Sequence, residues 1–429
     1  MSYLRRLKGF IEKDYFDFER PDINLYNFHP QLRILLIVNG IFFNNRNSRI
    51  RLIWPGGSIL LCMLAVCLES MFIYHGLTTK DYSFATECFC CFVLLGTMPV
   101  VSLSVLKNKD NILDLIENMN ETFIYIRRLE SKYRNSFLEG QLIIWKFYNA
   151  WLIFCCIVCG TFFMFPVFVL MYQSLFPSLD EDTTRPLVFP IWLPKLDGYS
   201  TPIYEIFLIL EINYCLIFLQ TFCVYIYTLF HILLHFYYIL HMIKLDLEAI
   251  FDDIDESVAL LPHRDTRRIE VQKILNGRMK RVVTWHISVF KAVEAVSSIY
   301  GPPLAYQVMF TSIAICLIAI QITQKLENGI LDIRFTMLGV AACLQMWIPC
   351  YLGTLLRNKA FGVGEACWNS GWHQTPLGRM IRQDIIIVLL RAQQPVTIKF
   401  PGLQSIQLET FSSIMTTSYS YFNMLRQYS

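Results

Sequence analysis

Seven long apolar stretches constrain the fold of this chain more than any other feature of its sequence. Each has about 18 residues or more, the length at which an α-helix can cross the hydrocarbon core of a bilayer. Only 17% of the residues are charged, which is typical of membrane proteins rather than of soluble domains. We therefore expect an all-α membrane protein with seven transmembrane helices. The stretches are Ile53–Tyr74, Ser83–Leu106, Leu142–Tyr172, Ile203–Ile243, Leu304–Thr323, Phe335–Leu356 and the less apolar Leu408–Leu425.

The third and fourth stretches are longer than a bilayer requires. A helix rises 1.5 Å per residue, so about 20 residues cross the hydrocarbon core. We expect both helices to project beyond the membrane, and the fourth continues into a charged, amphipathic sequence. The residues after it have a helical period that is interrupted near Pro262, and they could pack against a second amphipathic stretch at 378–395.

The distribution of Lys and Arg predicts which way the chain crosses the membrane. Connections 1–52, 107–141, 244–303 and 357–407 carry nine, six, nine and six of them. The alternate connections carry one, two, two and one. Cytoplasmic loops carry the excess of positive charge, so we expect a cytosolic N-terminus and an extracellular C-terminus. A rhodopsin-like receptor with seven helices has the opposite orientation.

The last stretch is unusually polar for a membrane span. Five polar residues recur every three or four positions and therefore share one face of a helix. Polar groups in hydrocarbon are costly unless they are paired. Close helix packing is one interpretation, because Ser and Thr let helices approach. A pore shared between subunits is the other. The predicted pore-lining residues are Glu409, Ser412, Thr416, Tyr419 and Asn423.

The sequence around this stretch resembles the C-terminal signature of insect odorant receptors. That signature contains R-S-Q-K-P-L, then L-E-T-F, then T-S-Y-S-Y-F-x-x-L-R. The chain has RAQQPV at 391–396, LETF at 408–411 and TSYSYFNMLR at 417–426, departing from the signature at Ala392 and Gln394. The segment 366–376, ACWNSGWHQTP, is similar to a cytosolic loop of the same family. The chain resembles a tuning subunit of that family more than its co-receptor.

The resemblance implies a function and a set of partners. It implies a small volatile odorant as ligand, a non-selective cation channel, and a heterotetramer with the odorant receptor co-receptor in the plasma membrane of a sensory neuron dendrite. It also implies that the last helix is split into an anchor half, Met380–Leu390, and a pore half, Leu408–Leu425, with Tyr419 near the gate. The resulting divisions are a cytosolic segment 1–52, spans 1–4 in 53–243, cytosolic anchor helices in 244–303, spans 5–6 in 304–356, a loop with the anchor half in 357–407, and the pore half with a short tail in 408–429.

The family resemblance also implies a ligand site in the outer half of the bundle, among the second, third, fourth and sixth spans. Aromatic and apolar walls suit a small volatile that is held by desolvation and dispersion. For each single Phe, ordinary helix packing is the simpler interpretation. Candidate ligand-binding residues at the right depth are Phe89, Phe92, Val93, Gly160, Phe162, Phe163, Tyr204, Leu208, Glu211, Tyr214, Phe335 and Leu338.

Two carboxylates, Glu87 and Glu211, stand out because ionisable residues inside spans are costly and usually functional. Glu211 could accept a hydrogen bond from a ligand N–H or pair with a Tyr or Ser of a neighbouring helix. A G-protein-coupled seven-helix chemoreceptor remains the alternative function, and the two differ in topology. The sequon at Asn120 lies on the predicted cytosolic side, where it would stay unmodified.

No enzymatic, cofactor or metal site is expected from the sequence. His231 and His235 have metal-like spacing, but the glutamate of the zincin motif does not follow the first of them. The 14 cysteines lie mostly in the apolar stretches, where a thiol behaves as a small hydrophobic group. Basic blocks with interleaved aromatics are missing too, so we expect no nucleic-acid partner.

Overall fold

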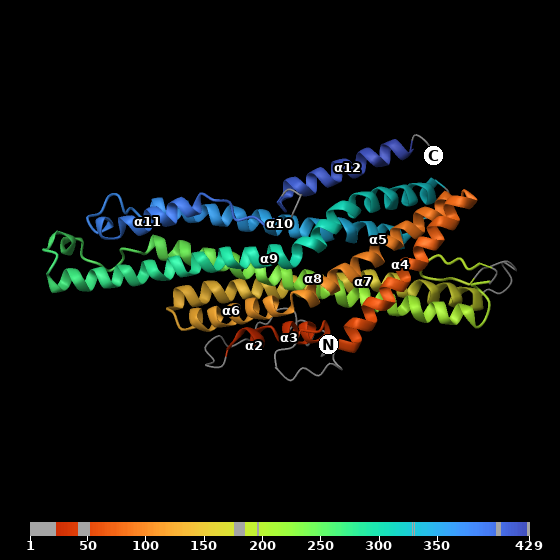
Figure 1. Ribbon diagram of the computed structural model, residues 1–429, viewed down its shortest axis with the longest axis horizontal. Coiled ribbons are helices and arrows are strands. Elements are labelled where there is room, and N and C mark those ends of the chain that lie inside the picture. The colour runs from red at the N-terminus through yellow and green to blue at the C-terminus, as the bar shows by residue number, and fades with distance from the viewer. Residues whose placement is uncertain are drawn as a thin grey trace.

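Each of the seven apolar stretches lies in a helix of the computed structural model (Figure 1). The structure describes residues 23–41, 52–175, 185–194, 197–327, 329, 331–399 and 405–426. The described residues contain no strand, so the prediction of an all-α fold is confirmed. The helices with the predicted spans are α4 (Ile53–Thr79), α5 (Tyr82–Lys107), α7 (Ser131–Leu175), α8 (Ile203–Glu248), α9 (Thr266–Glu327), α10 (Ile333–Asn369) and α12 (Leu408–Arg426).

Six of these helices, α4, α5 and α7 to α10, are long and apolar enough to cross a membrane. Helix α12, the seventh predicted span, is not among them, because its hydroxyl-rich sequence is not apolar enough. Helices α7 and α8 have 45 and 46 residues, which agrees with the expectation that they project beyond the bilayer. The fifth predicted span is only the last part of α9, which has 62 residues and contains Pro302 and Pro303.

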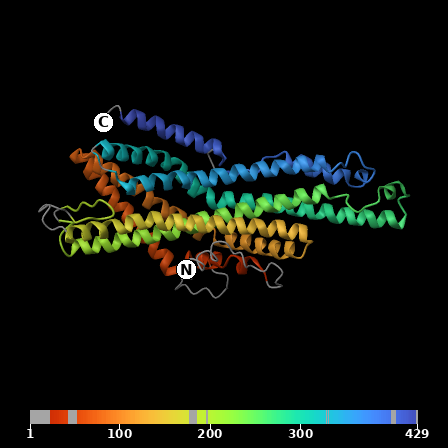
Figure 2. The ribbon, with the colours of Figure 1, turned by 180° about the vertical axis from the view of Figure 1, so that it is seen from behind.

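The helices run along one long axis, with α11 and the adjoining parts of α8, α9 and α10 at one end (Figures 1 and 2). Helix α11 (Gly378–Ala392) packs against α9 and α10. Gln272 Nε2 of α9 donates to the carbonyl of Met380 at 3.1 Å, and the guanidinium of Arg391 lies 3.8 Å from the ring centroid of Phe290. The amphipathic sequence that follows the fourth predicted span and the amphipathic stretch at 378–395 therefore pack against each other, as expected.

A bidentate ion pair joins α8 to α9 in this part of the bundle. Arg281 Nε donates to Asp246 Oδ2 and Arg281 Nη2 donates to Asp246 Oδ1, each at 2.5 Å. The Asp246 side chain is fully buried, and the Arg281 guanidinium also lies over the ring of Trp285, at 5.7 Å. Burial acts to lower the pKa of Arg281, but the hydrogen bond and charge of Asp246 raise it above its usual value, so the guanidinium stays charged.

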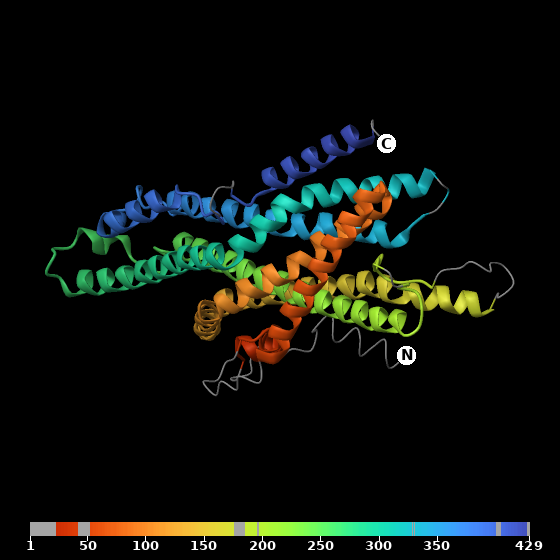
Figure 3. The same ribbon diagram turned by 45° about the vertical axis from the view of Figure 1, so that its right-hand side comes forward.

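Three further helices lie along one side of the bundle, nearer the middle of its long axis (Figure 1). They are α2 (Leu25–Phe28), α3 (Pro30–Val38) and α6 (Lys109–Arg127). The backbone N–H of Leu25 donates to Asn120 Oδ1 at 3.0 Å, which connects α2 to α6. The other end of the molecule holds much of α4, the start of α5, the end of α7 and the C-terminal end of α12, as Figure 3 shows. Helix α12 packs against α9 and α10 on one side of the molecule.

Candidate functional site

A small enclosed cavity lies among α5, α7, α8 and α10, the four helices that hold the second, third, fourth and sixth predicted spans. The cavity has a volume of about 50 Å³. Its walls are mostly apolar and aromatic. The lining residues are Glu87, Cys91, Leu94, Leu95 and Met98 of α5, Val158, Cys159 and Phe162 of α7, Val188 and Phe189 of the connection before α8, Tyr214, Cys215 and Phe218 of α8, and Arg334, Phe335 and Leu338 of α10.

Four of the twelve candidate ligand-binding residues line this cavity: Phe162, Tyr214, Phe335 and Leu338. The other eight lie around it. Phe89 and Phe92 pack on each other with ring centroids 6.0 Å apart, and Val93 is buried in α5. Gly160 is half-buried, Phe163 is 39% exposed, and Leu208 packs in an apolar cluster with Phe72. Tyr204 and Glu211 are buried and hold the connection before α8.

Sequence reasoning missed wall residues on all four helices and in the connection before α8, and two groups of them show why. Cys91, Leu95 and Met98 face the cavity from a helix that is apolar on most sides, where periodicity does not distinguish one face from another. Val188 and Phe189 come from a connection that folds back into the bundle, which no local pattern indicates. Glu87 was the one recognisable signal, because a carboxylate in an apolar stretch is unusual.

An ionic cluster fixes one end of the cavity. Asp332 caps α10 by accepting from the Arg334 N–H at 3.0 Å, and its carboxylate also pairs with the side chains of Arg334 at 3.0 Å and Lys325 at 2.7 Å. Burial acts to raise the pKa of Asp332, but these hydrogen bonds and charges lower it to about 2. The Arg334 guanidinium also lies 3.8 Å from the ring centroid of Phe165 in α7. The cluster therefore connects α9, α10 and α7 beside the wall residues Arg334 and Phe335.

The five polar residues predicted on one face of α12 are all exposed in the structure: Glu409, Ser412, Thr416, Tyr419 and Asn423. The opposite face is buried through Thr410, Ile414 and Ser418. Ser418 Oγ donates to the carbonyl of Ser312 in α9 at 2.9 Å. Close packing and a free polar face therefore coexist on this helix.

Two contacts attach the start of α12 to α10. The backbone N–H of Leu408 donates to Thr354 Oγ1 at 2.9 Å, and the guanidinium of Arg357 lies 3.3 Å from the Glu409 carboxylate. Glu409 is therefore exposed although it forms an ion pair with Arg357. The side chain of Tyr419 is 66% exposed. The polar face points away from the chain's own bundle and is available to line water or to meet another subunit.

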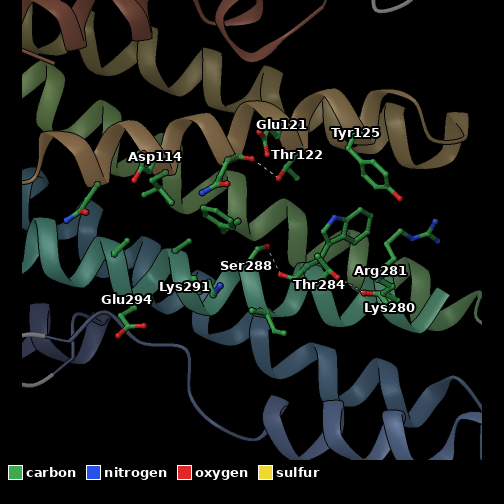
Figure 4. Close-up of a pocket in the computed structure, with 18 of the residues that line it drawn as sticks. Asp114, Glu121, Thr122, Tyr125, Lys280, Arg281, Thr284, Ser288, Lys291 and Glu294 are labelled. Atoms are coloured by element: carbon green, nitrogen blue, oxygen red, sulfur yellow. Dashed lines mark hydrogen bonds between the residues drawn. The ribbon is translucent and has the colours of Figure 1, made fainter. Parts of the chain in front are cut away.

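A larger open groove lies between α6 and α9, with a volume of about 1030 Å³ (Figure 4). The acidic residues Asp114 and Glu121 come from α6, and the basic residues Lys280, Arg281 and Lys291 come from α9. An open groove with charged walls of both signs suits an apolar volatile poorly, because such a ligand is held by an enclosed apolar surface. The small cavity is the better candidate for a ligand site.

The histidine pair is embedded in the core. His231 and His235 are both buried, and the ring of His231 meets those of His29 and Tyr227 edge to face, at 4.4 and 5.6 Å between centroids. His235 packs edge to face on Phe137 at 5.5 Å. Among the described residues, no group of three or more His, Cys, Asp or Glu side chains has an arrangement that could hold a metal ion.

Comparison with known proteins gives consistent results. The family model described as 7tm Odorant receptor matches residues 82–419. Odorant receptor 67c of Drosophila melanogaster is 28% identical over 145 residues, which is 34% of this chain and 35% of that relative. Putative odorant receptor 92a of the same organism is 22% identical over 373 residues, 83% of this chain and 82% of the relative. Several of these relatives thus match over about a third of their own length.

The fold is similar to that of a solved structure. The insect olfactory receptor OR5 from Machilis hrabei in complex with eugenol aligns with a TM-score of 0.72 at 16% identity, covering 94% of this chain and 99% of that one. The same receptor without the ligand aligns with a TM-score of 0.70 at 15% identity. At this identity the likeness establishes the fold.

Proposed function

Since the chain belongs to the insect odorant receptor family, we propose that it is the odorant-binding subunit of an odorant-gated, non-selective cation channel. The observation that carries the proposal is the combination of an enclosed apolar cavity among α5, α7, α8 and α10 with an exposed polar face on α12. The first suits a small volatile, and the second suits a water-filled pore. The proposed function is not enzymatic.

The proposed ligand site is the wall formed by Phe162, Tyr214, Phe335 and Leu338. The cavity is small, so ligand binding must expand it or select a wider arrangement of the four helices. A ligand opens a channel only to the extent that it binds the open arrangement more tightly than the closed one. Helix α10 is the direct route from the cavity to the pore, because it lines the cavity through Phe335 and holds the start of α12 through Thr354 and Arg357. Helix α9 contacts both ends of this route, through Lys325 and Ser312.

The proposed pore requires partner subunits, because one helix cannot enclose a channel. We propose that four such helices, contributed by this chain and by the odorant receptor co-receptor, surround a common axis. Glu409, Ser412, Thr416, Tyr419 and Asn423 would then face the ions, with hydroxyl and amide groups suited to weak cation selectivity. The proposed location is the plasma membrane of the sensory neuron dendrite, with the N-terminus in the cytosol.

The test is to record odorant-evoked currents from cells expressing this chain, the co-receptor, or both. We expect current only when both are present, and we expect it to persist when G-protein signalling is blocked. A response that disappears with the G-protein block would contradict direct gating and would favour a G-protein-coupled chemoreceptor instead.

A further inference from the structure

The connection before α8 forms part of the cavity wall. In residues 185–194, Val188 and Phe189 line the cavity. Leu187 and Ile191 are buried in a neighbouring apolar cluster with Phe72 of α4. The ring of Trp192 also stacks on that of His75 in α4, with 3.8 Å between centroids. We call residues 185–194 the wall segment.

Buried hydrogen bonds from α8 hold the wall segment in place. Glu211 Oε2 accepts the backbone N–H of Val188 at 2.8 Å, and the Tyr204 hydroxyl donates to the carbonyl of Pro186 at 2.9 Å. Glu211 is only 2% exposed. A buried N–H that loses its acceptor is left with the full cost of its desolvation, so this hydrogen bond is costly to break. Glu211 thus holds the backbone of the residue that lines the cavity.

We propose that Glu211 is a positioning residue for the ligand cavity. Its carboxylate fixes the place of Val188 and Phe189, and these two side chains determine the size of ligand that the cavity admits. This inference rests on the proposed function, because it takes the cavity to be the odorant site. Glu211 itself does not line the cavity. It therefore acts through the wall segment rather than by touching the ligand.

The native cysteines of the cavity provide a test that does not depend on current. Cys91, Cys159 and Cys215 line the cavity, and Val188 and Phe189 of the wall segment form another part of its wall. The full chain is expressed in cells, treated from outside with a membrane-impermeant thiosulfonate reagent, and analysed by mass spectrometry. We expect Glu211→Ala to label these thiols about tenfold faster or more, because the buried Val188 N–H loses its acceptor. Glu211→Gln keeps an acceptor oxygen and should be intermediate.

A matched control comes from the same helix. Glu205 also contacts the wall segment, through Arg185 at 3.5 Å, but both side chains are about half exposed. An exposed pair of this kind contributes little, so Glu205→Gln should label at the parent rate. An added thiol at the exposed Thr78 (Thr78→Cys), in the connection predicted to lie outside the membrane, serves as the internal reference for reagent delivery. Equal labelling of the cavity thiols in the parent chain, Glu211→Gln and Glu211→Ala would overturn the inference.

A second readout uses ligands of graded size with the co-receptor present. Glu211→Ala and Phe189→Ala should shift the preferred length in a homologous odorant series in the same direction, whereas a direct ligand contact by Glu211 would lower potency for every member equally. The experiment distinguishes failure of the proposed odorant site from failure of the positioning role of Glu211.

If odorants that evoke current do not protect the cavity thiols of the parent chain from labelling, the cavity is not the odorant site. Faster labelling of Glu211→Ala without ligand would still support the positioning role.

Discussion

Phe162 and Phe163 are neighbours in α7 with opposite surroundings. Phe162 lines the cavity, and Phe163 is 39% exposed on the outer surface of the bundle. We expect Phe162→Ala to enlarge the cavity and to shift odorant preference toward larger ligands by about tenfold in relative potency, since the Phe162 ring is partly buried and full burial of a Phe contributes about 1.5–3 kcal/mol. Dose–response series for small and large odorants measure the shift. Phe163→Ala is the control, and an equal shift in both variants would contradict the assignment of the cavity.

A second prediction at the residue scale concerns His286 in α9. Its side chain is 4% exposed and packs edge to face on Phe290. Burial, with a smaller effect from the charge of Arg391, lowers the pKa of His286 from 6.5 to about 4. The unfolded chain therefore binds this proton more readily, and stability falls as the pH drops from about 6.5 toward 4.

The size of this effect is on the order of 3 kcal/mol at its limit. Thermal unfolding of the detergent-purified chain across that pH window measures it. His286→Phe should flatten the pH dependence in the window, and an unchanged pH profile in this variant would rule out His286 as its source.

At the scale of elements, the long helices depend on specific pairings outside the predicted spans. Asp246 of α8 is fully buried and is neutralised by Arg281 of α9. Removing one partner of a buried pair leaves an uncompensated charge, at a cost of about 3–5 kcal/mol. We expect Asp246→Ala to reduce the amount of chain at the cell surface severely. The double variant Asp246→Leu with Arg281→Met should recover part of it, and failure of the double variant to exceed Asp246→Ala would show that the pair does more than balance charge.

The elements themselves were largely predictable because helix length and apolarity are local properties. The segment 53–74 reads as a span from composition alone, and the structure extends it only to Thr79. The polar face of α12 was also predictable, because its residues alternate with apolar ones at helical spacing. Much of the cavity wall was not, since Val188 lines the cavity from a connection whose backbone is held by Glu211, which lies 23 residues further along the chain. Contacts of this kind depend on tertiary packing and leave no periodic signal.

At the scale of the whole molecule, the account requires one orientation in the membrane. The excess of Lys and Arg in alternate connections predicts that the N-terminus is cytosolic and the C-terminus is extracellular. Epitope tags at the two ends test this prediction in intact and permeabilised cells. We expect the C-terminal tag to be accessible without permeabilisation and Asn120 to carry no glycan. A glycan on Asn120, or an N-terminal tag accessible on intact cells, would reverse the topology.

The assembled channel depends on which face of α12 meets the ions. Ser412, Thr416 and Asn423 are exposed, whereas Ile414 is buried against the chain's own bundle. The most direct measurement is the block of odorant-evoked current by a charged thiol reagent in single cysteine variants, each compared with the parent chain. We predict that Ser412→Cys, Thr416→Cys and Asn423→Cys channels are blocked while the odorant is present and that Ile414→Cys channels behave as the parent does. Block at Ile414→Cys alone, or no block at any of the three exposed positions, would contradict a pore lined by this helix.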